Sequence, residues 1–455
     1  MWRLSLRSKR LASRAEVDLE TFSLCKPASQ YLSPLLRAPR RQQKRTNWVL
    51  ARETTYHHCL KRPDRVGLPL YARGVHTTQQ DRPVAKSGEK TSTMDAQDVL
   101  LMLYAVDRDE KWEHELLQRV PGKLRVRWEN IRKPDGSIKA AHEHDPKLFE
   151  DVTMLFTYSP VPADAVPKLR FVQLSSAGSD LWQSHPRYLD SNVKFATTSG
   201  SNPPQIAEWV IGQWLKFQHH LSSYDENQKK HFWEPSLARQ VEDSVGLRVG
   251  ILGYGAIGRQ VSRLCRALGM EVYAFTASPR TTPESRVLRG YNLPNIGDPQ
   301  GELPARWFHS TSKEAVNDFL SQDLDMLVIS LPLTKLSRKL IGEEQFRILG
   351  KKKAFVVNIA RGPIVDQDAL IQALEHDVIR GAALDVTDPE PLPADHPLWD
   401  AKNCAITPHV SWLSTHQTDR ARDILADNVV RLFKGETLIN ELAHKARTHH
   451  EDCAG

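Results

Sequence analysis

Three side chains whose chemistry suits a carboxylate-bearing molecule follow or adjoin apolar runs in the second half of the chain. Arg361 comes just after the run 354–359, and a guanidinium can bind a carboxylate through two hydrogen bonds and polarise a neighbouring carbonyl. His409 follows the run 403–407, and an imidazole can give or take a proton near neutral pH. Glu390, in a Pro-Glu-Pro turn, could accept a hydrogen bond from the other ring nitrogen of that histidine. This contact would fix the tautomer of the histidine and favour its protonated form.

Each of these three residues also has a simpler interpretation. Arg361 could form a surface ion pair, Glu390 could be an ordinary turn acid, and His409 could be a loop histidine. Taken singly, the simpler interpretations are the stronger ones. Arg361 nevertheless lies at the carboxyl end of a predicted strand, where doubly wound sheets bind their ligands.

A glycine-rich turn is predicted at 249–258, where the sequence reads VGILGYGAIG. Its first four residues form the short apolar run of a buried parallel strand, and apolar side chains then recur at helical spacing up to Leu268. Gly253 allows a tight turn, Gly255 lets a pyrophosphate approach the backbone, and Gly258 lets the helix pack closely on its strand. The free N–H groups of the helix start can bind an anion. This arrangement predicts a dinucleotide site; the alternative is that the glycines only make a tight turn.

The next apolar run ends at Thr276, where the adenosine ribose of such a cofactor is expected. NAD-selective sites usually place Asp or Glu there, which bonds the ribose 2′-hydroxyl and repels a 2′-phosphate. Here Thr276 is followed by Ala-Ser-Pro-Arg, so Ser278 can donate a hydrogen bond and Arg280 can pair with the phosphate. We therefore expect NADP(H) to be preferred, with NAD(H) possible. Two alternatives stay open, an Arg280 that points into solvent and an acid such as Glu284 that takes over the missing role.

From about residue 96 strands and helices alternate, which predicts an α/β protein. The strands expected in the first block are 99–105, 124–128, 152–158, 169–174 and 194–197, with helices at 112–119 and 204–220. The strands expected in the second block are 248–252, 271–276, 325–331, 354–359, 380–385 and 403–407, followed by a helix at about 415–434. The segment 277–306 is rich in Pro and Gly, and we expect a long loop that is functional or disordered.

The first 93 residues differ in charge from the rest of the chain. They hold 19 basic and 7 acidic residues, a net charge of +12, whereas the remaining 362 residues hold 43 basic and 48 acidic ones, a net charge of −5. The first 15 residues contain no acid and are rich in Arg, Ser and Leu, the composition of a mitochondrial transit peptide. The sequence Arg73–Thr78 resembles the ends of fungal presequences. We expect import into the mitochondrial matrix. The alternatives are a disordered basic tail, or a cytoplasmic protein if translation starts at Met94.

The composition also speaks against several other classes of protein. The excess of positive charge belongs to the leader, so nucleic-acid binding by the folded part is not expected. The chain offers no run of about 18 apolar residues that would insert into a membrane. Its five cysteines (25, 59, 265, 404 and 453) are widely spread and form no CxxC pair, which indicates a reducing compartment and no metal site.

The run from about 170 to 440 resembles the D-isomer-specific 2-hydroxyacid dehydrogenase family, which includes D-lactate, 3-phosphoglycerate, glyoxylate and hydroxypyruvate enzymes and formate dehydrogenase. Several segments match in the family's order and with plausible spacing, and together they are far more specific than any one alone. They are LSSAGSD (174–180), IAEWV (206–210), VGILGYGAIGRQV (249–261), ISLPLT (329–334), VVNIARGPIVD (356–366), RGAALDV (380–386), DPEPLP (388–393) and ITPHVS (406–411).

The resemblance reverses the preference for the simpler interpretations, since Arg361, Glu390 and His409 match the family's catalytic Arg, Glu and His. It implies reduction of a short 2-keto acid such as glyoxylate or hydroxypyruvate to the D-2-hydroxy acid. The substrate carboxylate would meet the backbone amides of Ser176, Ala177 and Gly178 as well as Arg361. The implied cofactor contacts are Gly253, Gly255, Ala256, Ile257, Gly258, Arg259, Thr276, Ser278, Arg280, Leu331, Pro332, Ile359, Ala360, Asp385 and His409.

Some of these implied contacts have specific partners. Ile257 and Arg259 would touch the pyrophosphate, Pro332 would line the adenine pocket, and Asp385 would bond the nicotinamide carboxamide. The alternative role of Asp385 is that of a loop cap.

The resemblance also implies two doubly wound parallel-sheet domains, a Rossmann-type cofactor domain inserted into a smaller flavodoxin-like substrate domain. The expected organisation is a leader at 1–93, substrate domain at 94–220, cofactor domain at 221–410, a return helix at 411–445 and a tail at 446–455. A homodimer is implied as well.

Two other functions stay open. A non-catalytic NAD(H)-binding regulator of the corepressor type would need a peptide groove and a nuclear address. A formate dehydrogenase would be expected to carry Gln in place of Glu390.

Overall fold

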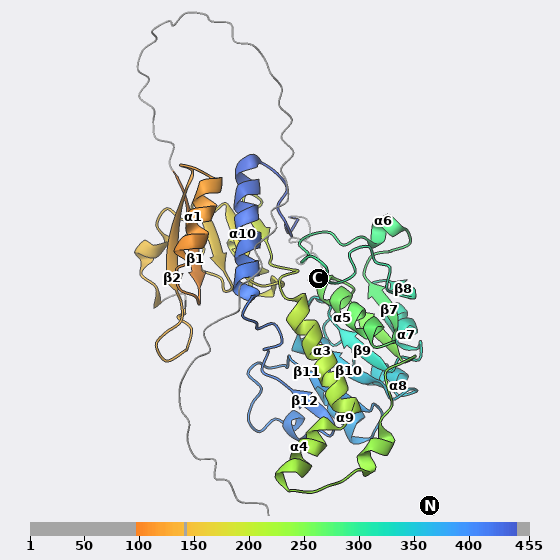
Figure 1. Cartoon of the computed structure of the whole chain (residues 1–455). Coiled ribbons are helices and arrows are strands. Elements are labelled where there is room, and N and C mark those ends of the chain that lie inside the picture. The colour runs from red at the N-terminus through yellow and green to blue at the C-terminus, as the bar shows by residue number, and fades with distance from the viewer. Residues whose placement is uncertain (1–96, 141–142, 444–455) are drawn as a thin grey trace, which may run out of the picture. The chain divides into compact units, whose positions relative to one another are not determined.

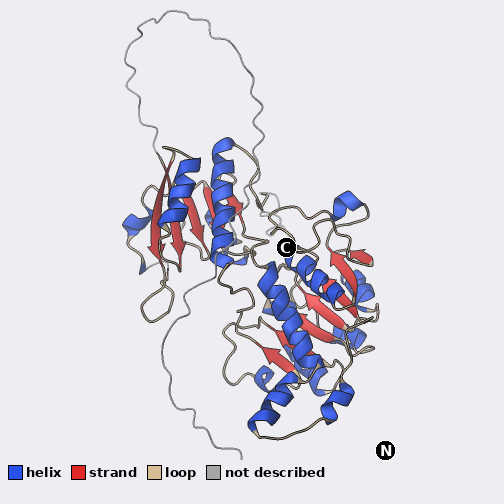
Figure 2. Ribbon diagram, viewed as in Figure 1, coloured by secondary structure: helices blue, strands red, loops and turns tan. Residues whose placement is uncertain are grey.

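The structure, a computed structural model, describes residues 97–140 and 143–443. The basic leader, with the predicted targeting segment, and the tail at 446–455 lie outside these residues. The described part contains two parallel β-sheets with helices beside them (Figures 1 and 2). This confirms the predicted α/β class.

The first sheet has five strands in the order β2-β1-β3-β4-β5, all parallel. This is the flavodoxin-like order expected for the smaller domain. The strands are β1 (Asp98–Tyr104), β2 (Leu124–Asn130), β3 (Met154–Thr157), β4 (Phe171–Leu174) and β5 (Lys194–Ala196). The helical elements with them are α1 (Glu110–Arg119), η2 (Pro146–Phe149), η3 (Asp180–Trp182), α2 (Pro186–Leu189) and α10 (Gln417–Lys434).

The second sheet has seven parallel strands in the order β12-β11-β10-β9-β6-β7-β8, which is the Rossmann order extended by one strand. The strands are β6 (Arg248–Leu252), β7 (Glu271–Thr276), β8 (Arg306–His309), β9 (Met326–Ile329), β10 (Phe355–Asn358), β11 (Gly381–Leu384) and β12 (Cys404–Ile406). The helices with them are α3 (Pro203–Gln218), α4 (Leu221–Lys229), α5 (Ala256–Ala267), α6 (Pro283–Arg286), α7 (Lys313–Leu320), α8 (Glu343–Leu349) and α9 (Gln367–Glu375). Short 3₁₀ turns are η4 (Ser236–Gln240), η5 (Gly362–Ile364) and η6 (Pro397–Asp400).

Alternation along the buried strands builds a core on each face of the larger sheet. On β6, Val249 and Ile251 face α3 and α5, which lie side by side (Figure 1). Leu252, pointing the opposite way, belongs to the core that α7, α8 and α9 cover. Because successive side chains of a strand point to opposite faces, a continuous apolar run is what a sheet covered on both faces requires.

Two helices, α3 and α10, follow the last strand of the first and of the second sheet along the chain, and their packing shows to which sheet each belongs. The apolar face of α3, with Ile206, Val210 and Trp214, belongs to the core of the seven-stranded sheet. The sequence had assigned this helix to the first block, 94–220, so the packing moves it to the cofactor-binding half. The return helix α10 packs Leu425 and Val429 into the core of the five-stranded sheet.

The segment 277–306, expected as a long loop, is ordered by buried polar contacts. The Asp298 carboxylate accepts hydrogen bonds from the amides of Glu302 and Leu303, at 2.9 and 3.1 Å, and from the Tyr254 hydroxyl at 2.8 Å. Gln260 of α5 accepts a bond from the Gly297 amide at 2.6 Å. The segment is thus fastened to the glycine-rich turn and to α5.

Candidate active site

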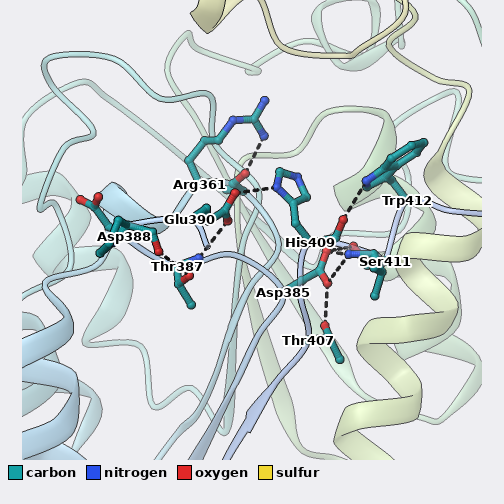
Figure 3. Close-up of polar contacts among 12 residues, drawn as sticks. Arg361, Asp385, Thr387, Asp388, Glu390, Thr407, His409, Ser411 and Trp412 are labelled. Atoms are coloured by element: carbon teal, nitrogen blue, oxygen red, sulfur yellow. Dashed lines mark hydrogen bonds and ion pairs between the residues drawn. The ribbon is translucent and has the colours of Figure 1, made fainter. Parts of the chain in front are cut away.

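The imidazole of His409 contacts the carboxylate of Glu390, with 2.9 Å between Nδ1 and Oε2 (Figure 3). The other carboxylate oxygen of Glu390 accepts a hydrogen bond from the Thr387 amide at 3.0 Å. The sequence analysis predicts this contact between Glu390 and His409, and the structure brings the two side chains together. With Nδ1 engaged, Nε2 is the ring nitrogen that can exchange a proton with a substrate.

The pKa of Glu390 reflects opposing influences. Partial burial raises the pKa of this carboxyl, but the hydrogen bonds from His409 and the Thr387 amide, helped by the charge of Arg361, outweigh burial. The pKa of Glu390 therefore lies below its usual value, and the side chain is a carboxylate at neutral pH. Such a carboxylate can accept a hydrogen bond from Nδ1 and so orient the imidazole.

Asp385 shapes the turn that carries His409. Its carboxylate, 1% exposed, accepts four hydrogen bonds, from the Thr407 hydroxyl, the Val410 amide, and the amide and hydroxyl of Ser411 (Figure 3). An ionised carboxylate offers about four acceptor positions, so these bonds make Asp385 a cap of the loop that carries His409. This is the alternative role expected for Asp385, and its contact with a nicotinamide carboxamide stays a prediction.

Arg361 follows β10 and reaches across to Asp180, which begins η3 after β4. Its Nε lies 3.0 Å from Oδ2 of Asp180 and its Nη2 lies 3.4 Å from Oδ1, while Nη1 donates to the Ala360 carbonyl at 2.7 Å. Asp180 lies in the matched segment LSSAGSD, yet nothing in that segment indicates a partner 181 positions away. The carboxyl ends of both sheets thus supply one polar cluster.

The turn after β4 approaches Arg361 closely. A Cβ on Gly178 would lie 2.4 Å from Nη2 of Arg361 and 2.6 Å from Oδ1 of Asp180, so any larger residue here would displace one of these two side chains. The turn is braced internally, since the Ser176 hydroxyl donates to the Gly178 carbonyl at 2.6 Å and the Ser176 carbonyl accepts from the Thr198 amide at 3.0 Å. The structure therefore brings the expected substrate-binding turn at 176–178 beside Arg361.

Tyr158, just beyond β3, lies at the same cluster and was not singled out in the sequence. Burial raises the pKa of its hydroxyl, and the charges of Arg361, Asp180 and Glu390 all act on it. The side chain as a whole is 44% exposed. Its place after a strand of the first sheet is the only sequence signal that could have pointed to it.

The glycine-rich turn fits a dinucleotide. Gly253 has φ of +106°, and a Cβ there would lie 2.6 Å from the Ser330 carbonyl oxygen; a Cβ on Gly258 would lie 2.5 Å from the Gly253 oxygen. At Gly255, by contrast, a Cβ would meet no atom within 4 Å. Two glycines are thus required by packing, and the third leaves open space at the start of α5, where Ala256 and Ile257 offer their amides.

Arg259 differs from its expected role. Its side chain is 3% exposed, and its guanidinium donates to the backbone carbonyls of Asp298 and Arg286 and lies 5.1 Å from the centre of the Tyr254 ring. This guanidinium holds the segment 277–306 in place, whereas the sequence expected it to touch the pyrophosphate. Nothing in the sequence around Arg259 indicates that a loop 27 to 39 residues away captures it.

The remaining expected cofactor residues surround the end of β7 and its neighbours. The Thr276 hydroxyl donates to the Ser278 carbonyl at 2.8 Å, and no acid occupies 276–280. Nη1 of Arg280 donates to the Ser285 carbonyl, and its buried Nε has no partner among the described residues. Ile359 and Ala360 are buried after β10, Leu331 is partly buried after β9, and Pro332 is exposed.

Comparison with known proteins identifies the family of this chain. The model of the D-isomer specific 2-hydroxyacid dehydrogenase NAD-binding domain matches residues 211–296 and 306–411. A glyoxylate reductase of Thermofilum pendens is 30% identical over 291 residues, covering 62% of this chain and 78% of that protein. The chain belongs to the D-isomer specific 2-hydroxyacid dehydrogenase family. It is thus an NAD(P)-dependent oxidoreductase that acts on CH–OH groups.

Two other members of the family are also similar to this chain. A hydroxypyruvate reductase of Blautia hydrogenotrophica is 26% identical and covers 63% of this chain and 83% of that protein. The crystal structure of a family member from Xanthobacter autotrophicus, in complex with NADPH and MES, is 27% identical, with a TM-score of 0.59 over 77% of this chain and all of that one.

Three further observations concern the described part of this dehydrogenase. No helix within 97–140 and 143–443 is long and apolar enough to cross a membrane. The same residues bring no three His, Cys, Asp or Glu side chains together as a metal site. Burial raises the pKa of the Cys265 and Cys404 thiols to about 12, so both are unreactive at neutral pH.

Proposed function

We propose that this dehydrogenase reduces a short 2-keto acid, glyoxylate or hydroxypyruvate, to the corresponding D-2-hydroxy acid. The observation that carries the proposal is the His409–Glu390 pair beside Arg361, gathered in one place in Figure 3. The pair supplies a proton donor, and the guanidinium supplies a cation for a carboxylate. Relatives named glyoxylate reductase and hydroxypyruvate reductase support the same substrate class.

The chain's own residues divide the work as follows. Arg361 binds the substrate carboxylate, and the small turn at 176–178 lets its backbone amides meet the same group. A nicotinamide cofactor held at the glycine-rich turn, by the amides of Ala256 and Ile257, would supply the hydride for the carbonyl carbon. His409 donates a proton from Nε2 to the carbonyl oxygen, and Glu390 holds the ring in position through its contact with Nδ1.

The proposed cofactor preference is NADPH. It rests on the lack of an acid at 276–280 and on Arg280, whose Nε has no partner within the described residues. Glu284, the acid that could take over the missing role, lies in the first turn of α6. Hydrogen bonds from its own amide and from the Thr282 side chain lower the pKa of the Glu284 carboxyl, so this carboxylate already has partners at the start of α6.

The proposed assembly is a homodimer formed through the segment after α3. This segment exposes large apolar side chains, with Phe232 57% and Trp233 93% exposed. Apolar groups of this size favour a partner surface. Analytical ultracentrifugation of the full chain tests the assembly, and Trp233→Glu should shift a dimer towards monomer.

The proposed location is the mitochondrial matrix, supported by the +12 leader and its acid-free start. A fluorescent fusion of residues 1–95 should collect in mitochondria. A fusion that stays diffuse in the cytosol contradicts this location without touching the enzymology.

The reaction is tested with purified full-length protein and a panel of glyoxylate, hydroxypyruvate, pyruvate and phosphohydroxypyruvate, each with NADH and NADPH. We expect the highest kcat/KM with glyoxylate or hydroxypyruvate. Protein that binds cofactor yet reduces none of the panel contradicts the proposed substrate class.

A further inference from the structure

The ion pair of Arg361 with Asp180 bears on how the substrate carboxylate is recognised, an inference that rests on the proposed function. A carboxylate already occupies part of the guanidinium that is proposed to bind the substrate. Asp180 could therefore be a competitor that the substrate must displace. Alternatively, it could hold the guanidinium so that another edge faces the substrate. The donor geometry distinguishes these two possibilities.

A guanidinium carries five N–H groups in one plane. The N–H groups of Nε and Nη2 that lie side by side face the two oxygens of Asp180, at 3.0 and 3.4 Å. One N–H of Nη1 donates to the Ala360 carbonyl, at 2.7 Å. Two N–H groups remain, one on each Nη atom, and they lie parallel at the end of the side chain. This end is the second edge to which a carboxylate can bind with two hydrogen bonds.

Asp180 is itself rigidly placed. The Trp182 indole, 1% exposed, donates to the Tyr158 carbonyl at 3.2 Å and packs on Phe195 with 5.4 Å between ring centres. The Ser179 hydroxyl lies 3.2 Å from the Tyr188 hydroxyl. The turn that carries Asp180 is therefore anchored in the core on both sides of the residue, and a side chain so held can orient its partner.

We propose that Asp180 is a positioning residue that fixes Arg361 so that its end edge is presented to the substrate carboxylate. Gly178 is part of this device, because any Cβ there would intrude between Asp180 and Nη2 of Arg361. The carboxylate of Asp180 also balances the charge of Arg361, which is 27% exposed, in the absence of substrate. A loosely held arginine would instead lose side-chain entropy each time it bound the substrate.

The test compares Asp180→Ala, Asp180→Asn and wild type in full-length protein saturated with NADPH or NADP. Binding of oxalate, a two-carboxylate mimic of a 2-keto acid, is measured by calorimetry, and kcat and KM are measured for glyoxylate. We expect Asp180→Ala to raise the oxalate Kd and the glyoxylate KM by about tenfold or more, with the Kd of NADPH unchanged. Asp180→Asn, which keeps one acceptor oxygen, should lie between Asp180→Ala and wild type.

Asp151→Asn is the matched control, since it removes an exposed carboxylate paired with Lys168 in the same half of the molecule. It should leave oxalate binding unchanged. In an Arg361→Ala background, Asp180→Ala should have no further effect on the oxalate Kd, because its action passes through Arg361.

Tighter or unchanged oxalate binding in Asp180→Ala overturns the proposal, and tighter binding identifies Asp180 as a competitor. An equal loss of oxalate and NADPH binding also overturns it, because that result indicates a general structural role. Oxalate binding is read without turnover, so a wild-type enzyme that binds oxalate but fails to reduce the panel contradicts the substrate assignment alone. A wild-type protein that does not bind oxalate contradicts both proposals.

Discussion

His409 and Glu390 are held in contact by hydrogen bonds to residues 385–387. The carboxylate of Glu390 is fixed by the Thr387 amide, and the backbone of His409 is fixed by the carbonyl of Asp385 at 2.8 Å, two residues before Thr387. A single short stretch after β11 thus positions both partners of the 2.9 Å contact. Rigid support of this kind sets the direction in which Nε2 points.

Replacing His409 with alanine removes the proposed proton donor. We expect kcat to fall about a hundredfold or more, the usual scale for loss of a general acid, while the Kd of NADPH stays near its wild-type value. Steady-state kinetics with glyoxylate and fluorescence titration with NADPH measure the two quantities. His416→Ala, an exposed loop histidine, serves as a control. Near-normal turnover in His409→Ala would falsify the assignment.

The lowered pKa of Glu390 predicts a pH-dependent contribution to stability. Because the pKa is lower in the folded than in the unfolded protein, the stabilisation is complete above the ordinary glutamate pKa of about 4.3 and is lost as pH falls through the folded value. Its size is small, since the Glu390 side chain is 38% exposed. Glu390→Gln should therefore lower the free energy of unfolding at pH 7 and approach wild type in acid. Urea unfolding between pH 3 and 7 measures this, and a difference that widens in acid contradicts it.

Gly258 and Gly212 offer a matched pair of alanine substitutions. At Gly258 a Cβ would lie 2.5 Å from a backbone oxygen, so Gly258→Ala should lower the free energy of unfolding by roughly 1–3 kcal/mol and weaken NADPH binding. Gly212, within α3, has no atom within 4 Å of its Cβ position, and Gly212→Ala should raise stability by roughly 0.5–1 kcal/mol. Denaturant unfolding measures both. Equal effects of the two substitutions would show that helix propensity, not packing against β6, governs Gly258.

The strands of the glycine-rich unit were predictable because burial on both faces makes them continuous apolar runs. The expected bounds 248–252 and 271–276 coincide with β6 and β7. β8 was missed, since this edge strand, with sequence RWFH, is only partly buried and follows a segment rich in Pro and Gly. The helices α7, α8 and α9 were also missed. They are short, at eight, seven and nine residues, so each offers few turns in which apolar residues could recur at helical spacing.

In the candidate site, too, local features were predictable from the sequence and long-range contacts were not. Each of the expected side chains Arg361, Glu390 and His409 lies in a local motif, so the sequence could indicate all three. What the motifs could not indicate is which long-range partner holds a side chain. Asp180 pairs with Arg361 from the other sheet, and carbonyls of a distant loop capture Arg259. Such partners depend on the packing of whole elements.

Arg280 decides the proposed cofactor preference. Its Nη1 is fastened to the Ser285 carbonyl, so the side chain is held near the end of β7 and does not extend freely into solvent. A hydrogen bond to a charged group contributes about 1.5–3 kcal/mol. Arg280→Ala should therefore lower kcat/KM with NADPH about tenfold or more and leave kcat/KM with NADH unchanged. Arg289→Ala, an exposed arginine in the same segment, is the matched control. Steady-state kinetics with both cofactors measure the ratio of the two kcat/KM values.

A higher kcat/KM with NADH in the wild type contradicts the alignment of Thr276 with the acidic position. Equal losses with both cofactors in Arg280→Ala would show that this arginine only stabilises the loop.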